Sequence, residues 1–134
     1  MPELTLGQRR AAHALARIQE IKGQKYGKYQ SYVKGLPTTI LNSGLGQAAA
    51  MLLASAKLGK QERSDDHRAY ETLYAHLSDW LCRDDSRGHA PYPGGDLMEA
   101  IVQHDLDDYA HAQAEALAYL EWLKKFAVAF LKEA

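Results

Sequence analysis

The chain has 134 residues and a mass of 14.9 kDa, so we expect one domain spanning residues 1–134. Hydrophobic residues make up 46% of it and charged residues 25%, which excludes a disordered chain and a collagen-like fibre. The single cysteine, Cys82, excludes an intrachain disulfide and a four-cysteine zinc site, and fits a reducing compartment. The longest apolar run, residues 48–54, is too short to span a membrane, and the first residues have no signal-peptide pattern. We therefore expect a cytoplasmic protein without membrane contact.

Charge is divided unevenly along the chain, although the net charge is only −1. Residues 1–60 carry a charge of +7 and residues 61–134 a charge of −8. This division predicts a surface with a basic side, which can attract phosphate, and an acidic side, which can stack against a neighbouring copy. The alternative is that folding mixes the two halves and cancels much of the asymmetry.

Alanine and leucine are abundant, valine is scarce, and no segment alternates in the manner of a strand. The sequence therefore predicts an all-α fold, a compact single-domain bundle of about five or six helices with a long C-terminal helix. The first helix is expected over residues 4–22, where Ala11, Leu15 and Ile18 share one face, and Gly23 interrupts it.

A tyrosine- and lysine-rich helix is expected next, broken by Gly35-Leu36-Pro37. A short helix over 37–42 should end at the turn residues Asn42-Ser43-Gly44. The stripe of small and apolar residues from Leu45 to Ala56 predicts the clearest helix of the chain, with Gly59 ending it.

Acidic residues mark the starts of the remaining helices. We expect Asp65 or Asp66 to cap a helix that ends near residue 84, and Asp96 to cap a short helix after the glycine-rich loop 86–95. Asp105 should cap the final helix, residues 106–133. That helix is apolar on two sides, which indicates a central position in the bundle or contact with a partner.

Three groups of residues are candidates for catalytic or metal sites. His104, Asp108 and His111 follow helical spacing, but a metal site in a helix bundle needs further carboxylates from other helices. The paired aspartates lie at predicted helix ends, where capping explains them, and Cys82 lies on an apolar helix, which favours a buried thiol. We expect no catalytic residues, no metal and no cofactor.

Basic residues of the N-terminal half give the one positive indication of function. Interleaved with tyrosines, they could form a surface that contacts the phosphates of a nucleic acid, although a solvated charged face and buried tyrosine rings are the alternative. The candidate nucleic-acid-binding residues are Arg9, Arg10, Arg17, Lys22, Lys25, Lys28 and Lys34.

Two segments also resemble a known family. One is residues 26–54, YGKYQSYVKGLPTTILNSGLGQAAAMLLA, and the other is residues 115–129, EALAYLEWLKKFAVA. Together they resemble the small helical subunit of the Cmr-type (type III-B) CRISPR effector complex. Gly35 departs from the family, which often has a polar or basic residue there.

The resemblance implies a non-catalytic subunit of an RNA-guided complex in antiviral defence. Its partners would be the other Cmr-complex subunits, which include the backbone and large subunits, together with guide RNA and target RNA. Copies would self-associate as a filament beside the backbone, with a basic face toward the guide–target duplex. Two alternatives remain open: a small metal-dependent nuclease built on His104, Asp108 and His111, and a free-standing helical homo-oligomer.

Overall fold

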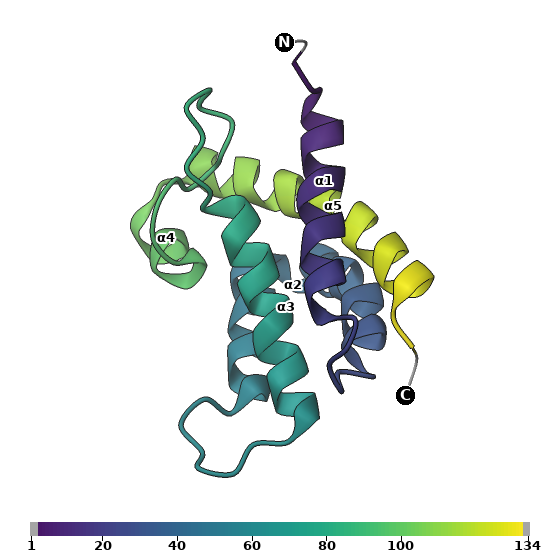
Figure 1. Cartoon of the computed structure of the whole chain (residues 1–134). Coiled ribbons are helices and arrows are strands. Elements are labelled where there is room, and N and C mark those ends of the chain that lie inside the picture. Colours follow the sequence, from purple (N-terminus) through teal and green to yellow (C-terminus); the bar gives the residue numbers. More distant parts are fainter. Residues whose placement is uncertain (1–2, 133–134) are drawn as a thin grey trace.

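Five helices make up the fold in the computed structural model, which describes residues 3–132 (Figure 1). The helices are α1 (Leu6–Ile21), α2 (Tyr29–Ala56), α3 (Asp65–Leu81), α4 (Leu97–Gln103) and α5 (Leu106–Phe130). No strand occurs among the described residues, and no helix there is both long and apolar enough to cross a bilayer. The predicted all-α fold with a long last helix is confirmed.

Side-chain caps begin four of the five helices. Thr5 forms a capping box at α1, and Asp96 and Asp105 cap α4 and α5 as predicted. The predicted aspartate cap of α3 is wrong: Ser64 has the extended backbone of an N-cap, and its hydroxyl accepts the His67 N–H at 3.2 Å. Both aspartates lie instead in the first turn, where the helix dipole favours negative charge.

The predicted break at Gly35–Pro37 is also wrong, because α2 continues through Pro37. Proline removes one backbone N–H but has a helical φ, and the hydroxyl of Thr39 donates to the Gly35 carbonyl in the same turn. The interruption comes at Gly44, whose φ of 87° and ψ of 159° suit glycine alone. The expected turn at residues 42–44 is therefore a kink within one helix.

Side chains of α5 cap the second half of α2 at this kink. The N–H of Leu45 donates to the Gln113 side-chain oxygen, and the N–H of Gly46 donates to the Tyr109 hydroxyl, both at 2.9 Å. A Cβ on Gly44 would lie 2.9 Å from that same hydroxyl. Close approach and positive φ thus both require glycine at position 44.

Helix α5 packs against α1, α2 and α3, and α2 also packs along α3. Residues from all five helices share one hydrophobic core. Buried alanines such as Ala48 on α2 and Ala116 on α5 let the helices approach closely. The α1–α2 loop and the last turn of α5 lie at the same end of the bundle (Figure 1).

Candidate nucleic-acid interface

The three arginines of α1 are held in ion pairs with carboxylates from the C-terminal half of the chain. Arg9 donates to Asp85 at 2.9 Å, and Arg17 donates to Asp79 at 2.8 Å. Arg10 forms a bidentate pair with Glu115, which is only 3% exposed. Folding therefore cancels part of the charge asymmetry of the sequence, and these guanidinium groups are engaged within the protein.

The pKa of Asp85 shows how strongly the neighbouring arginines stabilise an ionised carboxylate. Burial opposes ionisation of Asp85, but the backbone N–H of Arg87 and the guanidinium groups of Arg9 and Arg83 outweigh it and lower its pKa to about 2. Arg83 also stacks on Trp80, with its guanidinium carbon 3.7 Å from the ring centroid. The arginines and acids of this region form a structural network that joins α1 to the loop after α3.

The four candidate lysines have a different environment from the arginines. Lys22, Lys25, Lys28 and Lys34 are all exposed, and none forms an ion pair with another residue in the range 3–132. They follow the chain from the end of α1 through the loop into the first turns of α2. Their ammonium groups are available to solvent and to an anionic partner.

The start of α2 adds to this positive potential. Lys28 is its N-cap residue, no side chain accepts the first N–H groups, and no acidic residue lies in its first turn. The N-terminal end of a helix carries a partial positive charge. The lysines and this helix end therefore act in the same direction.

Two of the interleaved tyrosines, Tyr29 and Tyr32, are structural, as the alternative interpretation held. Tyr29 is fully buried, and its hydroxyl lies 2.7 Å from Nδ1 of His76. Tyr32 is half-buried and stacks on Tyr70 of α3, with 3.8 Å between ring centroids. Neither ring is presented as a free face for a nucleotide base.

Lys132 was missed by the sequence prediction. It lies just after α5, outside the basic half, but the fold brings it to the pocket that Lys22 and Lys25 line. Only the topology of the bundle connects the two ends of the chain, so no local pattern could have identified it.

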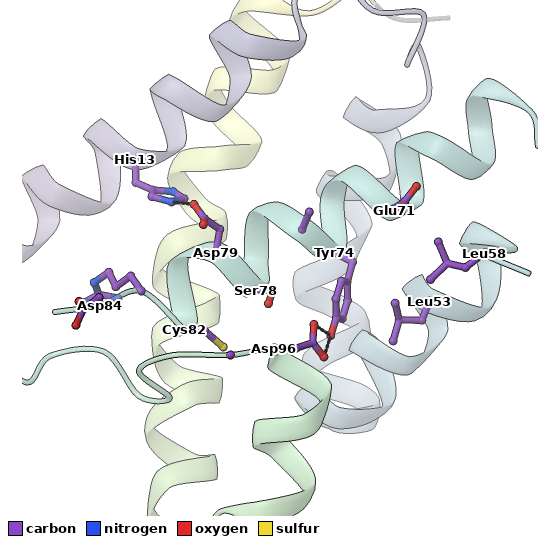
Figure 2. Close-up of a pocket in the computed structure, with 13 residues that line it drawn as sticks. His13, Leu53, Leu58, Glu71, Tyr74, Ser78, Asp79, Cys82, Asp84 and Asp96 are labelled. Carbon is purple, nitrogen blue, oxygen red and sulfur yellow. Dashed lines mark hydrogen bonds and ion pairs between the residues drawn. The ribbon is translucent and has the colours of Figure 1, made fainter.

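A pocket of about 730 Å³ runs along α3 and is acidic rather than basic (Figure 2). Three of its four carboxylates, those of Glu71, Asp79 and Asp96, already have partners within the protein. Figure 2 shows Asp79 directed toward His13, 2.6 Å from the imidazole, and Asp96 accepting from the Tyr74 hydroxyl at 2.8 Å. Glu71 pairs with Arg63 at 2.7 Å. These acids hold helices together, which favours a structural interpretation of the pocket.

Cys82, on the same pocket, is buried as predicted, and burial raises the pKa of its thiol to about 11. A nucleophilic cysteine needs the opposite shift, because the thiolate is the reactive form. The thiol of Cys82 is therefore protonated at neutral pH.

The spacing of His104, Asp108 and His111 produces one contact. Nδ1 of His104 lies 3.1 Å from the carboxylate of Asp108, and both side chains are well exposed. Within residues 3–132, no group of three or more His, Cys, Asp or Glu side chains is arranged to hold a metal ion. The geometry gives no support to the metal-site interpretation.

Comparison with known proteins identifies relatives over nearly the whole chain. The family model described as CRISPR-associated protein (Cas_Cmr5) matches residues 6–130. The CRISPR system Cmr subunit Cmr5 of Thermus thermophilus is 29% identical over 124 residues, 92% of this chain and 93% of that protein. The crystal structure of a CRISPR-associated Cmr5 family protein from the same organism superposes with a TM-score of 0.71 at 29% identity, covering 96% of this chain and 100% of that one.

Proposed function

The chain belongs to the Cmr5 family of CRISPR-associated proteins, and from this premise we propose that it is the non-catalytic small subunit of a type III-B effector complex in the cytoplasm. In this role its lysine surface, defined as Lys22, Lys25, Lys28 and Lys34, helps to hold the guide–target RNA duplex. The availability of these four ammonium groups, beside arginines that are already paired, is the observation that carries the RNA-binding part of the proposal.

The magnitude of the effect fits a subunit that works within an assembly. Each phosphate neutralised on a duplex adds about 0.9 to the slope of log affinity against log salt, so four lysines give a slope of at most about 3.6. That is a weak site for an isolated chain at physiological salt. When several copies are assembled on one RNA, the total affinity for RNA rises steeply, because each contact after the first is made within the same complex.

The partners we propose are the backbone and large subunits, guide RNA, target RNA and further copies of this chain along the filament. Several large apolar side chains remain exposed on the monomer, among them Leu41, Val102 and Leu106 at 68%, 73% and 79%. Side chains of this kind are suited to protein contacts. The acidic pocket along α3 and the lysine surface have opposite charge, which favours stacking of copies.

Reconstitution tests the proposal. The experiment mixes the full chain with the guide-bearing backbone subunit, the large subunit and guide RNA, and native mass spectrometry gives the composition of the product. The retention of target RNA is then measured as a function of salt concentration. We expect incorporation in more than one copy. The variant K25E/K28E/K34E should lower target retention at least tenfold.

The matched control is K57E/K60E/R68E, which makes the same change in charge on exposed residues of another part of the surface. It should retain target RNA as the parent chain does. Failure of the chain to enter a complex that otherwise assembles would overturn the subunit role. Equal effects of the two triple variants would overturn the role of the lysine surface.

A further inference from the structure

Another pocket, about 630 Å³, lies between the α1–α2 loop and the end of α5. Its volume is within the range of about 300–1,000 Å³ that small-molecule sites occupy. The described residues that line it include three lysines and no aspartate or glutamate. The three lysines are Lys22, Lys25 and Lys132.

Aromatic side chains form part of the wall of this pocket. Phe130 is 40% exposed, with Nζ of Lys22 over its ring at 5.6 Å from the centroid, and the half-buried Tyr26 also lines the pocket. Phe130 also ends a row of rings along α5, in which the centroids of Trp122 and Phe126 are 5.9 Å apart and those of Phe126 and Phe130 6.3 Å. Positive charge next to accessible aromatic rings is the combination that binds single-stranded nucleic acids, through phosphates and stacked bases respectively.

The walls are fixed by the fold rather than by the lysines themselves. The buried side-chain amide of Gln30 donates to the carbonyls of Ala127 and Leu131, at 3.1 and 3.5 Å, and so fastens the end of α5 to the start of α2. Within the loop, the N–H of Gln24 donates to the Ile21 carbonyl at 3.0 Å. A ligand therefore meets a preformed wall, which reduces the entropy lost on binding.

We propose that this pocket binds one unpaired nucleotide of an RNA strand, with its phosphate against Lys22, Lys25 and Lys132 and its base against Phe130 and Tyr26. The inference rests on the proposed RNA-facing role and adds a base-stacking site to it. A paired base cannot enter the pocket, since its faces are covered by its neighbours. Lysines and aromatic rings read no base edges, so recognition is independent of sequence.

Fluorescence anisotropy of the full chain tests the pocket, with a labelled single-stranded RNA of about 12 nucleotides and the blunt duplex of the same sequence, in about 50 mM salt. The single strand should bind more tightly than the duplex. Phe130→Ala should weaken single-strand binding about tenfold, the contribution of one stacked base, and leave duplex binding unchanged. Phe130→Leu keeps the apolar bulk without a π-face and should lose as much, whereas Phe130→Trp should retain binding.

Leu106→Ala serves as the control, because it removes an exposed apolar side chain at the opposite end of α5. It should change neither affinity. The pocket inference would be overturned if the single strand and the duplex bound equally, or if neither bound. It would also be overturned if the Phe130→Leu variant bound the single strand as tightly as the parent chain. Displacement of the RNA by a polyglutamate peptide, with no effect of Phe130→Ala, would also overturn it and identify an acidic protein segment as the occupant. The reconstitution with K25E/K28E/K34E is judged separately, so the lysine surface can hold even if the pocket does not.

Discussion

The arginines of α1 and the lysines that follow it have the same charge and are close in sequence, but they lie in different environments. Arg9, Arg10 and Arg17 contact carboxylates that are distant in the chain, whereas the lysine surface faces solvent. A planar guanidinium matches a carboxylate with two hydrogen bonds, whereas an ammonium is a hydrated point charge. The basic half of the sequence thus combines a structural arginine network with an exposed lysine surface for which we propose RNA binding, and we expect that each can be altered without the other.

The largest expected effect comes from breaking the bidentate pair between Arg10 and the buried Glu115. Arg10→Met leaves the Glu115 carboxylate, 3% exposed, without its partner, and should lower the free energy of unfolding by about 3 kcal/mol. Urea denaturation measures the change. R10M/E115M should recover most of the loss, because a pair of apolar side chains leaves no unpaired charge. A loss below about 1 kcal/mol in R10M would mean that the pair is not structural.

The second largest effect is expected from acid, which should lower the free energy of unfolding of the protein. Burial lowers the pKa of His76 to about 3, and burial also lowers the pKa of His13, despite the opposing effect of Asp79. The folded state therefore favours neutral imidazoles, while the unfolded chain takes up protons below about pH 6.5. Stability should fall with decreasing pH by up to about 1.4 kcal/mol per unit for each histidine, down to about pH 3 for His76.

Urea denaturation between about pH 7.5 and 4.5 measures this slope. His76→Asn should flatten it, whereas His111→Asn, at an exposed position, should not. An unchanged slope in His76→Asn would show that another group is responsible for the loss of stability in acid.

The smallest effect on stability is expected at the lysine surface. K22E/K25E/K28E/K34E changes exposed side chains without ion pairs in the described part of the chain, so the free energy of unfolding should stay within about 0.5 kcal/mol of the parent. The same denaturation experiment measures it. A larger loss would mean that the lysines also support the fold, and the contrast with the arginines would disappear.

Local patterns predicted most of the fold. The apolar stripe of 45–56, the caps Asp96 and Asp105, and the loop 86–95 each follow from nearby residues, and each is confirmed. The error at Pro37 arose because a proline restricts φ to a helical value as well as removing a hydrogen bond, and packing against α3 and α5 decides which effect prevails.

The candidate interface was less accessible from the sequence. A count of basic residues cannot separate Arg10 from Lys25, because the partner of Arg10 lies 105 positions away. Nor could it include Lys132 or Phe130, since only the packing of α5 on the start of the chain brings them to the α1–α2 loop. These residues depend on long-range topology rather than on spacing.

The kink at Gly44 also has a consequence for the order in which the chain folds. The first N–H groups after the kink are satisfied by Gln113 and Tyr109, which lie 68 and 63 positions later in the sequence. A nascent chain that has not yet supplied α5 can close the first half of α2, but the second half lacks its cap until a loop of more than sixty residues has closed. We therefore expect the two halves of this helix to gain protection from hydrogen exchange at different stages of folding, the first with local contacts and the second with the docking of the last helix.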